Sequence, residues 1–160
     1  MKRSLLVLSI CLGLVIGFSS LAYSQNTKLV TAQDLDTILN IAKGFGKAEL
    51  TTDRDGDPKI SGKISGSNYS VYFFGCKDGK DCRDIQFVTG WSGYDVTIDQ
   101  INDWNNKKRY GKVYLDDEND PMLIMPVNLY GGVSYENLED TFDWWVLVLE
   151  EFQEQVLGRK

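Results

Sequence analysis

The side chains of this 160-residue chain that could do chemistry are two cysteines near its middle, Cys76 and Cys82, and an excess of carboxylates. The chain contains no histidine, which excludes Ser-His-Asp and Cys-His catalysis, imidazole general bases and histidine-ligated zinc or copper sites. The two cysteines do not have the C-x-x-C spacing of thioredoxin-like proteins. A metal site would need two further ligands, so we expect Cys76 and Cys82 to form a disulfide in an oxidising compartment.

Residues 53–57 invite a calcium interpretation, because aspartates stand at the first, third and fifth positions of this segment. Pro58 occupies the position where an EF-hand loop needs glycine, and Ile64 the position where it needs a bidentate glutamate. A turn with solvated carboxylates explains the segment better. Residues 116–120 have the same interpretation, an acidic hairpin tip. We therefore predict no metal site, and no cofactor either, since the glycine pairs of the chain lack the pattern of a phosphate loop.

A pair of carboxylates could in principle cleave a glycosidic bond, and Trp91, Tyr94 and Trp104 could stack on sugar rings beside it. Such pairs normally lie in a deep cleft, which a domain of this size with short loops rarely builds. Most of these aromatic residues are better explained as core or interface residues. A small envelope protein that binds or cleaves carbohydrate remains the alternative hypothesis.

The N-terminus has the three zones of a secretory signal peptide over residues 1–24: a charged start, an apolar run and small residues before a cleavage point at Ser24/Gln25. An uncleaved anchor is a weaker alternative, because the apolar run is short and contains glycines. Acylation of Cys11 is weaker still, because Ile10 precedes it where a small residue is needed. We expect a periplasmic or secreted protein with no membrane insertion after cleavage. Its net charge of −6 disfavours nucleic acid as a partner.

After the leader, the hydrophobic period alternates between that of helices and that of strands. A first helix should follow a capping-box pattern that starts at Thr31, and another such pattern starts at Thr97 and opens a helix that ends near residues 107–109. Ser134 should cap a last helix that runs to about residue 156. The predicted strands are residues 47–53, 58–65, 69–76, 82–91, 111–117 and 122–129.

The hairpin that contains the two cysteines can be checked internally. If Cys76 faces Cys82, then Phe73 faces Ile85, and the neighbouring apolar residues also pair on the face opposite the cysteines. One register thus satisfies both the apolar face and the disulfide. Closing so short a loop should stabilise the hairpin by roughly 2 kcal/mol.

The last predicted helix carries an apolar stripe at heptad-like spacing, formed by Leu138, Phe142, Trp145, Leu149, Phe152 and Val156. Trp144, Leu147 and Val148 lie off this stripe. One interpretation is that these three residues contact a protein partner. The other is that the helix is sandwiched between the sheet and the first helix, and the sequence does not separate the two.

Several segments together resemble the YbjN family of bacterial sensory transduction regulators. The resemblance covers about residues 30–155 and rests on residues 69–76, 85–91, 104–105 with 109–111, 114–117 with 120–121, and 131–134. It implies a fold like that of type III secretion chaperones, an antiparallel sheet with helices before, within and after it, in proteins that frequently dimerise. It implies no reaction and no catalytic residue. The best-known members are cytoplasmic, whereas this chain begins with an export signal.

These observations predict one α+β domain over residues 25–160, with the element order α-β-β-β-β-α-β-β-α. The predicted function is that of a non-enzymatic, exported binding, adaptor or regulatory module that acts by protein–protein contact, is chaperone-like and forms a homodimer. A purely structural envelope protein has the same sequence features and is not separated from this hypothesis.

Overall fold

The computed structural model describes residues 29–159. The leader predicted over residues 1–24 and its cleavage point lie outside these residues. Between residues 29 and 159, no helix is both long enough and apolar enough to cross a membrane. The helices and strands follow in the order α1 Leu35–Phe45, β1 Lys47–Thr52, β2 Pro58–Ile64, β3 Ser67–Phe74, β4 Asp84–Gly90, α2 Ile98–Lys107, β5 Lys112–Leu115, β6 Pro121–Asn128 and α3 Tyr135–Gln155.

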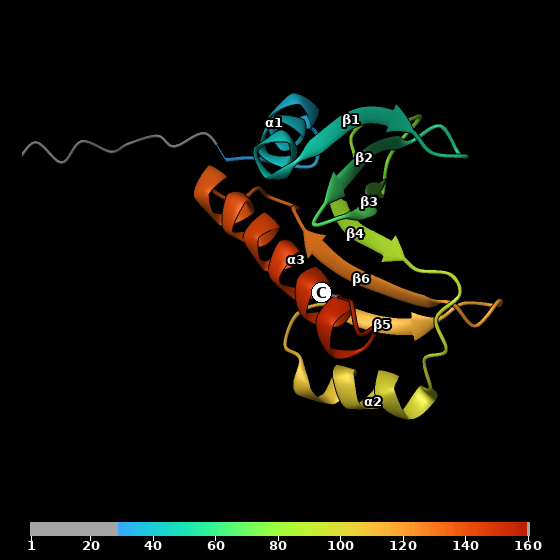
Figure 1. The fold of residues 1–160 in the computed structure, drawn as a ribbon. Coiled ribbons are helices and arrows are strands. Elements are labelled where there is room, and N and C mark those ends of the chain that lie inside the picture. The colour runs from blue at the N-terminus through green and yellow to red at the C-terminus, as the bar shows by residue number, and fades with distance from the viewer. Residues whose placement is uncertain (1–28, 160) are drawn as a thin grey trace, which may run out of the picture.

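All six strands join one antiparallel sheet in the order β1-β2-β3-β4-β6-β5. The predicted α+β class and element order are therefore confirmed. The last hairpin inserts with β6 beside β4, which leaves β1 and β5 as the two edges. Helices α1 and α3 lie on one side of the sheet, and α2 lies beyond its β5 end (Figure 1).

The core lies between the sheet and α3. Trp145 stacks on Phe87 of β4 at 5.2 Å between ring centroids, and Phe142 meets the same ring edge-on at 4.8 Å. Both α3 residues belong to the apolar stripe predicted from the sequence, and five of its six members are fully buried. Helix α3 is thus held by a continuous aromatic core.

The hairpin of β3 and β4 has the predicted register, in which Phe73 faces Ile85. The predicted disulfide joins Cys76 to Cys82. Both cysteines lie just beyond the strand ends rather than inside the strands. The reason is Gly75, which follows β3 with a φ of +66° and turns the chain out of the extended conformation.

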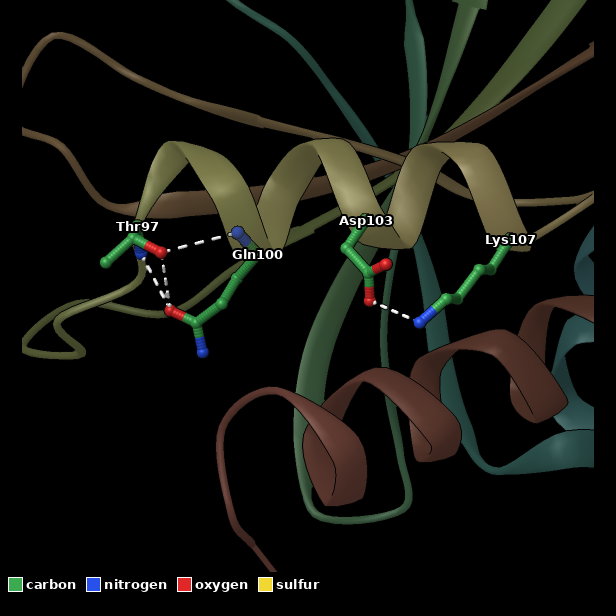
Figure 2. Close-up of polar contacts among 4 residues, drawn as sticks. All are labelled: Thr97, Gln100, Asp103 and Lys107. Atoms are coloured by element: carbon green, nitrogen blue, oxygen red, sulfur yellow. Dashed lines mark hydrogen bonds and ion pairs between the residues drawn. The ribbon is translucent and has the colours of Figure 1, made fainter.

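The helix starts follow the predicted caps at two of three places. Thr97 and Gln100 form a capping box at the start of α2, and Lys107 bonds Asp103 one turn further along (Figure 2). The Ser134 hydroxyl accepts the backbone N–H of Asn137 at 3.1 Å at the start of α3. Helix α1 instead begins at Leu35, later than its capping-box pattern predicted.

The residues before α1 are fixed by the Thr31 backbone N–H and hydroxyl, which both donate to the Asp34 carboxylate, at 2.9 and 3.0 Å. This bonding makes a turn that precedes the helix instead of its first turn. One residue earlier, Val30 forms an antiparallel bridge with Val133, with N-to-O distances of 2.7 and 3.0 Å. The start of the described chain is thereby tied to the segment just before α3.

Candidate functional site

The sheet face turned away from α1 and α3 carries no helix of the described residues (Figure 1). Its apolar members, called the open-face patch below, are Tyr72, Phe74, Val88, Tyr114, Met122, Ile124 and Pro126. Phe74 and Tyr114 expose 46% and 45% of their surface. A sheet face that contacts only water is normally polar along alternate residues. The open-face patch is therefore an apolar surface that no helix or loop of residues 29–159 covers.

The patch has a defined relief. The Met122 side chain occupies the space that a Cβ atom on Gly90 would need, so this glycine lets Met122 lie flat across β4. Beside it, a shallow hollow of about 350 Å³ is lined by residues of β2, β3, β4 and β6 that include Ser70, Tyr72 and Val88. The rings of Tyr72 and Phe74 lie 6.5 Å apart. These groups can bury an apolar side chain of another molecule but include no acid–base pair.

The charges around the patch are mostly basic. On strands β2 to β6, this face carries Lys59, Lys63 and Lys112 but a single acid, Asp84. The Lys59 ammonium lies 5.6 Å from the centroid of the Tyr72 ring. The chain as a whole has a net charge of −6. The open face is thus locally opposite in sign to the rest of the molecule, which favours an acidic rim on a partner.

The three residues predicted to contact a partner on α3 divide into two groups. Trp144 and Leu147 expose 38% and 44% of their surface. The Trp144 ring packs against Tyr110 at 4.8 Å, so one of its faces is already covered. Val148 is buried, with 3% exposed, and packs against Gly111. This burial corrects the sequence interpretation for Val148, which belongs to the core because α3 has apolar neighbours on two sides.

The aromatic residues proposed to stack on sugar rings do not form a platform. Trp91 and Trp104 are 7% and 3% exposed, and both pack against Phe152 of α3 at ring distances of 5.2 and 5.1 Å. Tyr94 is partly buried. The structure thereby corrects the interpretation of the two tryptophans: their indole faces are core surfaces, and neither is free to bind a sugar.

The two acidic hairpin tips have the same internal bonding. The Asp53 carboxylate accepts the backbone N–H groups of Asp55 and Asp57 at 2.9 and 3.0 Å. Asp116 accepts those of Glu118 and Asp120 at 3.1 and 2.8 Å. Residues 29–159 contain no group of three or more His, Cys, Asp or Glu side chains that could hold a metal ion. The sequence predicted turns with solvated carboxylates; in the structure the first carboxylate of each tip instead accepts backbone N–H groups of its own turn.

The largest hollow among those described, about 710 Å³, lies between the β2–β3 turn and the C-terminal end of α3. Beneath it the Ser67 hydroxyl accepts the Trp91 indole N–H at 2.9 Å and donates to Gln153 at 3.2 Å. Arg159 reaches the same hydroxyl at 3.3 Å. Every one of these polar groups has a partner inside the domain. The cluster therefore docks the end of α3 onto the sheet rather than offering free groups to a ligand.

Among the described residues, the pKa values of Tyr69 and Glu136 depart from their ordinary range. Burial raises the pKa of the Tyr69 phenol to about 12. Its hydroxyl and the Trp145 indole N–H are buried without a hydrogen-bond partner among the described residues. At the start of α3, hydrogen bonds from its own backbone N–H and from Ser134 lower the pKa of Glu136. The Tyr69 hydroxyl is buried and the Glu136 carboxyl is fully exposed, so neither has the setting of a catalytic acid or base.

The β5 edge is closed by α2. The Asn105 side chain donates to the Val113 carbonyl at 2.8 Å and accepts the Val113 N–H at 2.9 Å. The Trp104 indole N–H donates to the Gly111 carbonyl at 2.9 Å. Lys112 in turn donates to the carbonyls of Asn105 and Lys108 near the C-terminal end of α2. This edge therefore has few free backbone groups.

Fold and surface together define an α+β protein whose sheet has one face covered by α1 and α3 and one face that no described helix covers. The model of the YbjN family, described as "Putative bacterial sensory transduction regulator", matches residues 34–158. Because this match covers most of the sequence, the chain belongs to the YbjN family. No curated protein matches the chain.

Sequence reasoning missed the open-face patch, although a signal for it exists. Residues 122–127 are apolar at every position, whereas a strand with one solvent-exposed face alternates between apolar and polar residues. The residues 71–74 of β3 are likewise Val, Tyr, Phe and Phe. Such runs indicate a strand with two apolar faces. Only the arrangement of α1 and α3 on one side reveals that the second face stays uncovered.

Proposed function

We propose that this protein is an exported, non-enzymatic regulatory module that binds a partner protein through the open-face patch. The observation that carries the proposal is the uncovered sheet face, on which Phe74 is exposed next to Tyr72 at one end and Tyr114 is exposed opposite Met122 at the other. Exposed apolar surface of this kind marks interaction sites. The family's description as a regulator is consistent with a module that works by contact.

The partner should be a protein with an apolar contact surface and an acidic rim. Buried aromatic side chains dominate the binding energy of protein interfaces, and Phe74 and Tyr114 are placed to serve as such anchors. Lys59, Lys63 and Lys112 surround the patch and would steer an acidic rim onto it. Trp144 and Leu147 on α3 form a smaller, separate apolar surface. They are the second candidate for partner contact.

Export is supported by two independent features. The first is the three-zone leader over residues 1–24. The second is the disulfide between Cys76 and Cys82, a bond that persists in oxidising compartments. Mass spectrometry of the protein purified from its native envelope tests this part: a chain that begins at Gln25 agrees with export and cleavage. A reduced, full-length chain recovered from the cytoplasm would refute it.

The absence of enzymatic activity is inferred from the residue inventory. The chain has no histidine, and the Glu136 carboxyl group, whose pKa is lowered, is fully exposed on a helix end. A general acid or base needs a perturbed group in a site that excludes water.

Site-specific photocrosslinking tests the binding surface. A photoreactive amino acid replaces Phe74 in one strain and Tyr114 in another, and the envelope is irradiated. We expect the same partner adduct from both positions, and its loss when Ile124→Asp is introduced. The matched control is the same amino acid at Ile98 of α2, which is 59% exposed but lies away from the open face. Equal adducts from Ile98, or none from the open face, would contradict the proposal.

A further inference from the structure

The hydrogen-bond pattern of β1 shows which of its backbone N–H and C=O groups bond β2 and which point away from the sheet. In an antiparallel pair, residues point their N–H and C=O groups alternately toward the neighbouring strand and away from it. The Asp53 N–H donates to the Asp57 carbonyl at 2.9 Å, in the same register as the β1–β2 pairing. The odd-numbered residues of β1 therefore bond β2. The even-numbered residues, Ala48, Leu50 and Thr52, point their backbone groups outward.

The same rule can be checked at the other edge. The Asp116 N–H donates to the Asp120 carbonyl at 3.0 Å, which makes Val113 and Leu115 the outward residues of β5. Val113 is indeed the residue whose backbone groups are bonded from outside, by the Asn105 side chain. At the β1 edge, nothing within residues 29–159 occupies the corresponding groups. In addition, Leu50 is 40% exposed there.

We propose that β1 is the interface for a second copy of this chain, paired antiparallel about a two-fold axis through Leu50. In this register Leu50 faces Leu50 of the second copy, and Ala48 faces its Thr52. All three outward residues of each strand then find hydrogen-bonding partners. On the opposite face of the ladder, Lys47 faces Asp53 of the second copy, twice. Charge and apolar contact are thus both self-complementary, as an isologous interface requires.

Neighbouring registers lack this complementarity. Sliding the second copy by two residues places Glu49 opposite Glu49 in one direction and opposite Asp53 in the other, and like charges directly opposed are destabilising. Sliding by four residues brings Thr52 of the second copy beside Gly44, which belongs to α1. Sliding by four the other way runs the strand into the turn of residues 53–57. The register centred on Leu50 is the one that satisfies both charge and space.

The Asp53 side chain can serve the turn and the interface together. One of its carboxylate oxygens, Oδ1, accepts both turn amides. Within residues 29–159 the other oxygen, Oδ2, accepts no hydrogen bond, and the residue is partly exposed. Helix α1 lies at the start of β1, and the strand runs away from it toward this turn (Figure 1). In the pairing about Leu50, the Asp53 turn of each copy lies opposite Lys47 at the start of the other copy's β1.

The pairing should be weak and dependent on concentration. One strand pair buries less area than the roughly 1,200 Å² at the lower end of stable interfaces. The mass of the purified protein, measured by light scattering or sedimentation, should rise from that of a monomer toward that of a dimer as its concentration increases. This inference does not rest on the proposed function, because it concerns a different surface and needs no partner protein.

Two charge variants test the register. Lys47→Glu places a glutamate opposite Asp53 of the other copy at both ends of the strand pair. This variant should stay monomeric at every concentration. The control, Lys107→Glu, makes the same charge change on the exposed surface of α2, beyond the other end of the sheet. It should dimerise as the wild type does. Circular dichroism checks that both variants fold.

Cysteine crosslinking supplies a second measurement. With the two-fold axis through Leu50, residues 50 of the two copies have Cα atoms about 5.5 Å apart, within the range of a disulfide. Leu50→Cys should therefore form a covalent dimer on oxidation. Thr52→Cys should not, because its two copies lie about 14 Å apart along the ladder. Hydrogen exchange of the wild-type Leu50 and Thr52 amides should slow as protein concentration rises.

A wild type that stays monomeric at all concentrations, with fast exchange at Leu50, would overturn the proposal, and so would an edge that pairs only with a peptide of another protein. A dimer that survives Lys47→Glu and crosslinks through Thr52→Cys would overturn the register and with it the assigned interface. Failure of this test leaves the open-face patch untouched, since the photocrosslinking experiment uses other residues.

Discussion

At one edge of the sheet the Asn105 side chain bonds both outward backbone groups of Val113, while at the other edge no described residue reaches those of Leu50. The two edge strands are otherwise alike. Each begins with a lysine, and each exposes one large apolar residue, Tyr114 on β5 and Leu50 on β1. The difference therefore lies in the neighbouring element rather than in the strand. An edge is closed when a helix brings an amide to it, and it remains available for pairing when none does.

The same contrast extends to the buried polar groups on each side. Near β5, the buried indole N–H of Trp104 has a carbonyl partner. On the β1 side, the Tyr69 ring covers Gly62 of β2, and the Tyr69 hydroxyl is buried without a partner among the described residues. At β5 the outward groups of Val113 and the Trp104 indole are thus bonded, whereas the β1 side has unpaired groups at its edge and at the Tyr69 hydroxyl among the described residues.

The largest expected effect comes from truncating Trp104, the buried residue of α2 that bonds the Gly111 carbonyl just before β5. Trp104→Ala should lower the free energy of unfolding by about 3–5 kcal/mol, because it empties a buried ring site and orphans the Gly111 carbonyl. Urea denaturation followed by circular dichroism measures this loss. Trp144→Ala, at a half-exposed site, should lose much less. Equal losses for the two variants would contradict the assignment of Trp104 to the core.

The second prediction opens the closed edge without emptying the core. Asn105→Ala should lower the free energy of unfolding by about 1–3 kcal/mol, because it removes both bonds to Val113. The Val113 amide should then exchange with solvent as fast as the Leu50 amide does in dilute protein. Asn106→Ala, at the exposed neighbouring position, is the control. An unchanged exchange rate at Val113 would show that the Asn105 side chain does not protect this backbone group.

The third prediction concerns the unpaired hydroxyl on the β1 side. Tyr69→Phe should raise the free energy of unfolding by about 1 kcal/mol, because it removes a buried polar atom that has no partner.

The same residue predicts a pH dependence. The folded state holds the Tyr69 proton more tightly than the unfolded state, since burial raises its pKa from 10.0 to about 12. The wild type should therefore lose stability as pH rises above about 10, where the unfolded chain releases this proton first. Thermal melts between neutral and alkaline pH measure the loss, which should be smaller in Tyr69→Phe. If the wild type and Tyr69→Phe lose stability equally as pH rises, Tyr69 is not the group responsible.

The smallest effect is expected at the open edge. Leu50→Asn should change the free energy of unfolding of the dilute protein by less than about 0.5 kcal/mol, because the side chain is 40% exposed and on an edge. The same substitution should weaken self-association, since Leu50 lies on the proposed axis. Denaturation in dilute solution and mass measurement in concentrated solution separate the two effects. A large loss of monomer stability would mean that Leu50 belongs to the core.

Local features of the fold were predictable from the sequence, because they depend on residues close together in the chain. The element order follows from hydrophobic period, and the Phe73–Ile85 register follows from the cysteines. The box of Thr97 and Gln100 needs only four consecutive residues. The start of α1 was predicted too early, because Thr31 and Asp34 bond each other in a turn of their own.

Features that depend on distant residues were not predictable. The burial of Trp91 and Trp104 comes from packing against Phe152, far along the chain, and an aromatic residue alone does not reveal which side it faces. The placement of β6 beside β4 determines which strands become edges. The bonding of the Val113 backbone by Asn105 depends on the position of β6 in the sheet as well as on the position of α2. The candidate surface therefore emerges only from the assembled sheet.

The bridge between Val30 and Val133 determines how this domain bears a pull on its N-terminus. Any tension from a segment that precedes residue 29, whether a membrane anchor or the export machinery, reaches the fold first at two backbone hydrogen bonds. Those bonds join the entering chain to the residues that lead into α3. The load therefore passes to the largest helix and its aromatic core instead of to the sheet edge. Strand β1 could then remain free to pair while the chain is held from its beginning.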